Sequence, residues 1–301
     1  MFNGIITPIV TPFNRDKEQS INYQAAQELV DKLISAGVRG IFALGSNGEF
    51  HVLTHTEKIA FVKAVVQYVD HRVPVFAGAG ACSTSETIAL SCEMKAAGAD
   101  ALSIINPYFI KPQDDELFDF YHDVAASVDL PVIMYNIPKN TGYNIPVNVV
   151  RKLAKIDNIV GIKDSSGDVD LIRKYQEVAT DNKFQVLIGS DSKISVAYKL
   201  GVRAAIAGTS NLIPNILVSL DHALKDGNDQ EAEKLQKSID VLRSALKLGT
   251  VPAVLKRSVE LANIANVGPA RKPVRETTTQ VDLEIIKMLK YYGSEFIVKA
   301  N

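Results

Sequence analysis

Eight short apolar runs recur along this chain, and each is followed by a longer segment with helical periodicity. The runs are rich in Val and Ile, as β-strands are, and strands that alternate with helices form parallel sheets. The expected strands begin at Gly4, Gly40, Val73, Ala101, Pro131, Ile159, Phe184 and Ala204. Eight such units within about 220 residues predict an α/β fold, a (β/α)8 TIM barrel rather than a doubly wound open sheet.

The segments between the strands carry the sequence signals of helix ends. Helices are expected over residues 22–36, 54–69, 83–97 and 116–127. Ser83 precedes Glu86 by three residues, which is the spacing of a capping box. Gly37 and Gly98 stand just past the last turns of two of these helices, where glycine commonly ends a helix. These signals indicate genuine crossover helices.

After Asn211 the strand signals stop and only helical patterns follow. Helices are expected over residues 214–223, 229–247, 251–263 and 282–291. No Ser/Gly/Pro-rich linker or low-complexity tract separates this part from the rest. We therefore predict a barrel domain over residues 1–220 and a C-terminal helical extension, packed against the barrel, over residues 221–301.

Composition narrows the class of partner. Lys and Arg total 33 against 34 Asp and Glu, so the formal net charge of −1 gives no field to attract nucleic acid or an acidic membrane. No apolar run approaches the roughly eighteen residues that a membrane helix needs. The N-terminal residues lack a basic region followed by a long apolar run. We expect a cytoplasmic protein whose partners are small molecules or copies of itself.

The two cysteines, Cys82 and Cys92, give no sign of a metal site. Neither lies in a Cys-x-x-Cys pair or near a histidine at metal-ligand spacing. Both fall in or near a predicted helix, so we expect buried or half-buried thiols in a reducing compartment.

The carboxyl ends of the strands are where a barrel of this kind places its chemistry. After the second expected strand comes Gly45-Ser46-Asn47-Gly48-Glu49-Phe50. Two glycines that bracket small polar residues let the backbone bend so that successive N–H groups converge, which makes a nest for a carboxylate or phosphate. The spacing alone favours an ordinary polar turn, so the nest needs support from the other strand ends.

The third expected strand ends in Ala77-Gly78-Ala79-Gly80, a weak G-x-G pattern. A dinucleotide-binding loop would need a third glycine and an acidic residue closing the next strand, and the sequence has neither. Close backbone packing at the barrel rim is the better explanation of these glycines.

Two further strand ends carry side chains suited to proton transfer and nucleophilic attack. The fifth expected strand delivers Tyr135, whose hydroxyl can move protons in a closed site, although a tyrosine there more often packs in the core or rim. The sixth, Ile159-Val160-Gly161-Ile162-Lys163, delivers a lysine. An ammonium buried without a partner is costly, so Lys163 either reaches water along its apolar stem or serves chemistry.

Lysine, tyrosine and a carboxylate nest together suit a 2-oxo acid. An amine that has lost its proton can attack the ketone and form a Schiff base, which turns the substrate into an electron sink. Tyr135 would relay protons as water departs, and the loop at Ser46 and Asn47 would hold the carboxylate. We therefore expect Lys163 to be a nucleophile.

In this order and spacing, the motifs resemble the family of dihydrodipicolinate synthase and N-acetylneuraminate lyase, the pyruvate-dependent class I aldolases. The resemblance covers nearly the whole chain. It is carried by Gly4-Ile5-Ile6-Thr7-Pro8, Gly45-Ser46-Asn47-Gly48-Glu49, Tyr135-Asn136-Ile137-Pro138, Gly161-Ile162-Lys163-Asp164-Ser165 and the helical C-terminus. It implies a homotetramer or dimer without metal or organic cofactor, with Lys163 as the Schiff-base lysine, Tyr135 as the proton relay, and Ser46 and Asn47 as the carboxylate-binding loop.

Three departures from the lysine-pathway synthases of this family bear on the substrate. Those enzymes typically carry two threonines where this chain has Ser46-Asn47, a second tyrosine at Phe109, and at Asn140 an arginine that meets the second substrate's carboxylate. Phenylalanine cannot transfer a proton, and asparagine cannot form a charged fork with a carboxylate. The loop motif, the Asn-Thr-Gly at 140–142 and residues 184–190 are most similar to 4-hydroxy-2-oxoglutarate aldolases, with 2-keto-3-deoxy sugar acid aldolases as near neighbours.

The leading prediction is therefore a class I lyase that reversibly cleaves a 4-hydroxy-2-oxo acid to pyruvate and an aldehyde. Tyr135 or Ser165 would take the proton of the C4 hydroxyl, and Asn140 would contact the substrate. A 4-hydroxy-tetrahydrodipicolinate synthase, condensing pyruvate with aspartate semialdehyde, is the first alternative, and a hydratase or dehydratase could use the same imine. A non-catalytic pyruvate-binding or regulatory protein is the alternative of another class, although intact Lys163 and Tyr135 argue against it.

Overall fold

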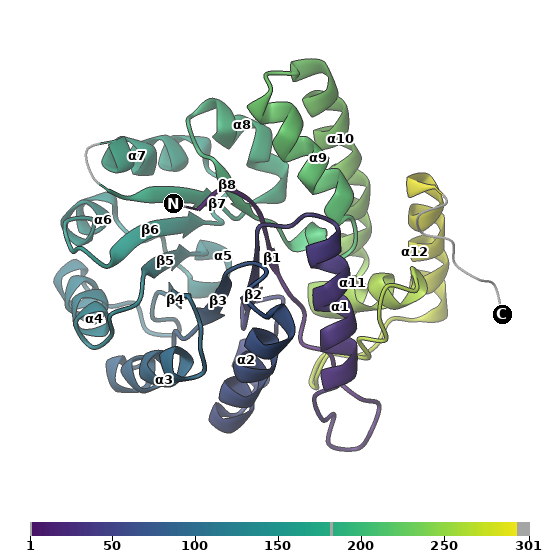
Figure 1. Ribbon diagram of the computed structural model, residues 1–301, viewed down its shortest axis with the longest axis horizontal. Coiled ribbons are helices and arrows are strands. Elements are labelled where there is room, and N and C mark those ends of the chain that lie inside the picture. The colour runs from purple at the N-terminus through teal and green to yellow at the C-terminus, as the bar shows by residue number, and fades with distance from the viewer. Residues whose placement is uncertain (1, 181–182, 294–301) are drawn as a thin grey trace.

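A computed structural model describes residues 2–180 and 183–293, and its eight strands close into a parallel barrel (Figure 1). Each strand pairs with the next along the chain, and the last pairs with the first. The strands are β1 (Gly4–Pro8), β2 (Gly40–Ala43), β3 (Val75–Gly78), β4 (Ala101–Ile105), β5 (Val132–Asn136), β6 (Ile159–Asp164), β7 (Gln185–Ile188) and β8 (Ala204–Ile206). The predicted (β/α)8 barrel is confirmed.

Five strands begin at the predicted residue, and β3, β5 and β7 begin one or two residues later. The strands β3 and β5 each follow a proline, whose nitrogen has no hydrogen to donate to the ladder. Pro74 and Pro131 still take part through their carbonyls, which accept hydrogen bonds from the neighbouring strands at 3.1 and 2.8 Å. The third late start places Gln185, not Phe184, at the beginning of β7.

Inward-pointing apolar side chains fill the barrel, so it is a packed core and not a pore. This inner cluster consists of Ile6, Phe42, Phe76, Ala101, Ile133, Val160, Leu187, Ala204 and Ile206. Alternate residues of a strand share a face, and Tyr135 therefore stands two positions beyond Ile133 on the inner face of β5. The register of β5 and β6 pairs Tyr135 with Lys163. The inner face thus changes from apolar packing to reactive side chains at the carboxyl end of the barrel.

Helices follow the strands in the predicted order, and all but the short α5, which lies near the strands at the centre of the view, cover the outside of the barrel (Figure 1). They are α1 (Tyr23–Ser35), α2 (His55–Val69), α3 (Thr84–Ala96), α4 (Asp114–Ala126), α5 (Pro138–Thr141), α6 (Val147–Leu153), α7 (Val169–Thr180), α8 (Ile194–Lys199) and α9 (Pro214–Lys225). The side chains of Asn22, Thr54 and Ser83 cap α1, α2 and α3 by accepting a hydrogen bond from an N–H of the first turn.

The caps of α3 and α4 differ from the sequence prediction, and α12 begins three residues before its predicted start at Asp282. The capping box predicted at Ser83 forms only by half: Ser83 accepts from the Glu86 N–H, but the Glu86 carboxylate pairs with His55 at 2.8 Å instead of returning to the cap. Helix α4 begins two residues before the predicted start because Gln113 and Glu116 form a capping box there.

The C-terminal extension consists of α10 (Asp229–Ala245), α11 (Val251–Leu261) and α12 (Thr279–Tyr292), with α10 packed on α9 and α12 packed on α10 and α11 (Figure 1). The predicted boundary between barrel and extension, at residue 220, falls inside α9, and the two-part division stays a prediction. Positions 294–301 of the predicted extension lie outside the described residues. Within the described part of the chain, no helix combines the length and apolar character needed to cross a membrane.

The prediction of buried thiols is wrong, because Cys82 and Cys92 are both exposed. The face of α3 that packs inward carries Thr87, Leu90 and Met94, which recur at helical spacing. Cys92 lies off that face, and Cys82 stands in the turn before the helix. Proximity to a helix therefore gave no information about which face the side chain occupies.

Candidate active site

A cavity of about 230 Å³ opens at the carboxyl end of the barrel and holds five of the six site residues predicted from the sequence. These are Lys163, Tyr135, Ser46, Asn47 and Ser165. The sixth, Asn140, does not line this cavity. It lines an adjoining cavity of about 710 Å³, which shares Ser46, Asn47, Ile137 and Val251 with the first.

Lys163 ends in this cavity with no countercharge. Its side chain comes from β6, is 3% exposed, and forms neither an ion pair nor a hydrogen bond with any residue that the structure describes. Its Nζ lies 4.0 Å from the centroid of the Tyr135 ring and 5.0 Å from that of Phe42. An amine held against two aromatic rings and open to a cavity is positioned to attack a bound carbonyl.

Lys256, the other buried lysine, has the hydrogen-bond acceptors that a buried ammonium normally needs. Its Nζ donates to the carbonyls of Thr11 and Pro269 at 2.8 and 2.5 Å and to the Glu49 carboxylate at 3.1 Å. Burial lowers the pKa of Lys256 to about 8, and Glu49 opposes that shift. Of the two buried lysines in the described chain, only Lys163 lacks such acceptors, which favours a chemical role for it.

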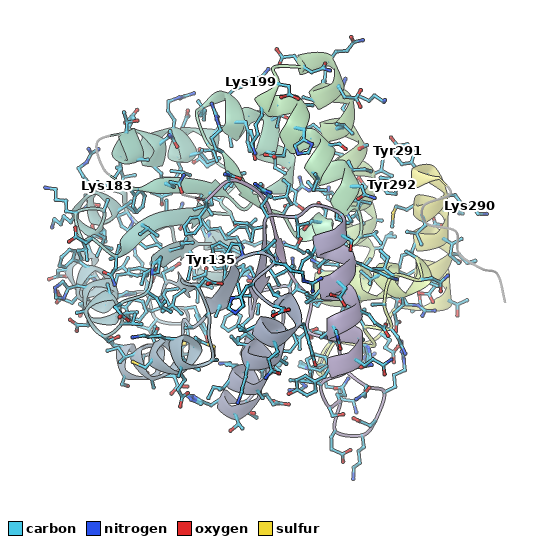
Figure 2. The ribbon with its side chains drawn as sticks, viewed as in Figure 1. Tyr135, Lys183, Lys199, Lys290, Tyr291 and Tyr292 are labelled. Carbon is cyan, nitrogen blue, oxygen red and sulfur yellow. The ribbon has the colours of Figure 1, made fainter. Side chains whose placement is uncertain are left out.

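Tyr135 links Lys163 to the Ser46 loop. Its hydroxyl lies 3.3 Å from the Ser46 Oγ, within hydrogen-bond distance. Figure 2 places Tyr135 inside the ring of strands, whereas the labelled Lys199 and Lys290 lie at the periphery. A hydroxyl pair beside an amine can pass a proton between the substrate and the cavity.

The loop at Ser46 and Asn47 presents two free backbone donors. The N–H groups of both residues have no acceptor in the described parts of the chain, whereas the N–H groups of Gly48 and Glu49 close turns onto Gly45 and Ser46. Glu49 has a φ of 55°, in the left-handed region, which bends the chain at the end of the loop. The free donors suit a carboxylate, as the sequence predicts.

Glu49 holds this loop in place, a role that the sequence analysis did not find. One carboxylate oxygen accepts from Lys256, and the other accepts from the Arg271 N–H at 2.9 Å. Thr11 also donates its hydroxyl to the Gly48 carbonyl at 2.6 Å. The loop is therefore anchored by the segment that follows β1, by α11 and by the segment between α11 and α12.

Comparison with known proteins identifies the family. Residues 1–292 match the model of the dihydrodipicolinate synthetase family. The chain belongs to this family. A 4-hydroxy-tetrahydrodipicolinate synthase of Methanoculleus marisnigri is 35% identical over 293 residues, covering 97% of this chain and 100% of the relative. An uncharacterized DapA-like lyase of Halobacterium salinarum is 34% identical over 273 residues, covering 91% of this chain and 88% of the relative.

Solved structures agree with this assignment. YagE, a prophage protein of E. coli K12 in the dihydrodipicolinic acid synthase family, was solved in complex with pyruvate. It matches with a TM-score of 0.92 and 32% identity, covering 97% of this chain and 98% of its own. Dihydrodipicolinate synthase DapA-2 of Bacillus anthracis matches with a TM-score of 0.92 and 31% identity, covering 96% and 98%. As a member of the dihydrodipicolinate synthetase family, the protein is a lyase.

Gly189 makes room for two side chains at the carboxyl end of β6, those of Lys163 and Ser165. A Cβ at Gly189 would lie 2.1 Å from the Ser165 Oγ and 2.8 Å from the Lys163 Cε, distances that real contacts do not reach. Ser165 is fixed in turn by its N–H, which donates to the Asn136 carbonyl at 2.8 Å. The role of this glycine is not visible in the sequence, because no local signal shows that Gly189 approaches Lys163.

The glycines of the third strand serve packing, as predicted. A Cβ at Gly78 would lie 2.2 Å from the Leu44 carbonyl oxygen, and one at Gly80 would lie 2.7 Å from the Ile105 nitrogen.

No group of three or more His, Cys, Asp or Glu side chains among the described residues is arranged to hold a metal ion.

Proposed function

We propose that this member of the family joins Lys163 to pyruvate as an imine and adds the resulting enamine to an aldehyde. The observation that carries the proposal is the buried, unpaired Nζ of Lys163, 4.0 Å from the Tyr135 ring at the cavity floor. The free N–H groups of Ser46 and Asn47 would hold the carboxylate of pyruvate and fix C2 near the amine.

The chemistry follows from these positions. The Lys163 amine adds to C2, and the carbinolamine loses water to give a protonated imine, with Tyr135 and Ser46 moving the protons. Loss of a C3 proton gives the enamine, whose C3 attacks the aldehyde carbon. Tyr135 or Ser165 protonates the new alkoxide, and water then releases an open-chain 2-oxo acid from the lysine. With aspartate semialdehyde, the amino group of the bound aldehyde can instead attack C2, displace the Lys163 amine and close the ring. The reverse sequence cleaves a 4-hydroxy-2-oxo acid.

The names of the relatives support aspartate semialdehyde as the aldehyde. The Methanoculleus relative is a 4-hydroxy-tetrahydrodipicolinate synthase, and so is a relative of Methanopyrus kandleri that is 34% identical over 291 residues. We therefore propose 4-hydroxy-tetrahydrodipicolinate synthase as the principal function. This differs from the leading prediction of the sequence analysis, which places aldol cleavage first.

Cleavage of a 4-hydroxy-2-oxo acid is the second candidate, supported by two positions. Phe109 is 94% exposed and its ring cannot relay a proton, and Asn140 lies outside the Lys163 cavity. Both positions lack the groups that the lysine-pathway reaction is expected to use. A 2-oxo acid such as 4-hydroxy-2-oxoglutarate needs only the imine and the hydroxyls already described.

Incubation with pyruvate and borohydride tests the common step. Mass spectrometry of the digested protein should find a reduced pyruvyl group on Lys163, and a folded Lys163→Met variant should carry none. An unmodified Lys163 in the folded wild type would refute the imine. The initial rates of pyruvate condensation with aspartate semialdehyde and of pyruvate release from 4-hydroxy-2-oxoglutarate then rank the two candidates, and a non-catalytic protein would show neither.

The remaining proposals concern the setting of the reaction. The imine itself supplies the electron sink, so we expect activity without an added metal or organic cofactor, and dialysis against a chelator should leave the rate unchanged. We further propose a cytoplasmic location and self-association as a dimer or homotetramer.

A further inference from the structure

A second cationic side chain lines the cavity that holds Lys163. Arg243 comes from the last turn of α10 and shares the cavity wall with Leu246, Val251 and Leu255. These four residues all belong to the C-terminal extension, which therefore contributes three apolar side chains and one guanidinium to the site. The Arg243 side chain is 33% exposed, as expected of a group that faces an open cavity.

The guanidinium of Arg243 has only one weak ion pair with the described part of the protein. Its one ion pair among the described residues is with Asp240, at 3.9 Å on the same helix, and the Asp240 side chain is 61% exposed. Such a contact contributes little in water. By contrast, Arg257 holds Asp282 at 2.7 Å and Arg271 holds Glu57 at 2.8 Å. Arg243 thus keeps its N–H donors for water or a ligand.

The same wall offers a hydroxyl without a partner. Thr209, in the short helix η3 (Gly208–Asn211), is buried, and its Oγ1 has no hydrogen-bond partner among the residues that the structure describes. Asp191 is the one carboxylate lining the cavity among the described residues, and it already accepts from the N–H groups of Gly208 and Thr209 at 3.3 and 2.8 Å. A buried oxygen left unpaired is costly, so Thr209 suits an oxygen-bearing ligand.

We propose that Arg243 binds a carboxylate at the far end of the second substrate and thereby selects carboxylate-bearing aldehydes over neutral ones. The inference rests on the proposed function, because it assigns Lys163 to the imine and the Ser46 and Asn47 N–H groups to the pyruvate carboxylate. Arg243 is then the only cation lining the cavity in the described chain that remains for a second anion. Its planar fork matches a carboxylate, and a cavity of about 230 Å³ suits a small aldehyde.

The test compares aldehydes that differ in one charge. Condensation with pyruvate is measured for glyoxylate and aspartate semialdehyde, which carry a carboxylate, and for acetaldehyde and propanal, which do not. An Arg243→Met variant should lose on the order of 10- to 100-fold in kcat/KM for the carboxylate aldehydes and remain within about twofold of wild type for the neutral ones. Arg243→Lys, which keeps the charge but not the fork, should fall between them.

Two controls separate this inference from the proposed function. Lys247→Met removes an equal charge from an exposed position outside the cavity and should leave all four rates unchanged. Borohydride trapping of pyruvate on Lys163 should proceed equally in wild type and Arg243→Met, because the pyruvate carboxylate binds elsewhere. A uniform loss across the four aldehydes, or weaker trapping in the variant, overturns the role of Arg243 while leaving the imine intact. Absence of the adduct in wild type overturns both proposals.

Discussion

The Nζ atom of Lys163 lies 4.0 Å from the centre of the Tyr135 ring, and the two residues occupy paired positions of β5 and β6. The pairing places the amine beside a phenol because both side chains point into the barrel from neighbouring parallel strands. No countercharge among the described residues holds the amine. The barrel therefore presents an amine and a phenol side by side on one sheet, as the proposed imine chemistry requires.

Replacing Tyr135 with phenylalanine should slow the reaction without unfolding the protein. The ring that packs over Lys163 remains, but the hydroxyl that meets Ser46 at 3.3 Å is lost. We expect turnover to fall about 10²- to 10⁴-fold, the usual cost of removing a general acid–base group. Steady-state kinetics together with the thermal unfolding midpoint check this. Ser46→Ala removes the other hydroxyl of this pair and should reduce turnover less than Tyr135→Phe does. Equal turnover in wild type and Tyr135→Phe would contradict the proton relay.

Replacing Lys256 with methionine should destabilise the fold and disturb the substrate loop together. Lys256 and Glu49 are both almost fully buried, so the variant leaves the Glu49 carboxylate without its cation. Breaking such a pair costs about 3–5 kcal/mol in the free energy of unfolding. Urea unfolding followed by circular dichroism measures it. The double variant Lys256→Met/Glu49→Gln should recover part of the loss, and a double variant less stable than the single one would contradict the pairing.

The barrel and its reactive pair were predictable because their signals are local. Runs rich in Val and Ile, separated by capped helices, give the strand order, and the lysine that follows the apolar run of β6 marks the carboxyl end of that strand. The paired Tyr135 follows from the same rule, since neighbouring parallel strands end at the same rim. The side chains at the carboxyl end of each strand can therefore be predicted from the sequence without knowing how the helices pack.

Residues that act across long sequence distances were not predictable in this way. Lys256 lies in a helix, where a lysine is normally exposed, and only the tertiary contacts with Thr11 and Glu49 show that it is buried. Arg243 likewise reads as a surface residue of α10. Which face of a helix meets the cavity depends on how the extension packs, and the same uncertainty explains the error over Cys92.

Phe109 should mark a contact between copies of the chain. Its ring is 94% exposed, its neighbour Ile110 is 72% exposed, and its φ of 82° is unusual for a bulky residue. Adjacent apolar side chains held outward suit an interface better than contact with water. Light scattering on a sizing column should find wild type larger than a monomer and Phe109→Asp shifted toward the monomer. Leu283→Asp, on α12, is the control, and a monomeric wild type would refute the expectation.

His55 should make stability depend on pH. Its Nδ1 lies 2.8 Å from Glu86 and its Nε2 contacts Glu93, so both ring nitrogens face carboxylates, which only the protonated ring can satisfy by donating twice. The bonds to Glu86 and then Glu93 raise the pKa of His55 above its usual value. A pKa raised by folding contributes stability that is fully present below the unfolded value of about 6.5 and is lost as pH rises through the folded value.

A His55→Gln variant tests this sign. The difference in unfolding midpoint between wild type and variant should be largest near pH 5.5 and should shrink by pH 8.5, as the wild-type imidazole loses its proton. The other histidines are present in both proteins and cancel in the difference. His222→Gln controls for the loss of an imidazole elsewhere. Its difference in unfolding midpoint from wild type should not shrink between pH 5.5 and pH 8.5 as that of His55→Gln does. A His55→Gln gap that stays constant or widens with pH would mean that the two carboxylates do not hold a charged ring between α2 and α3.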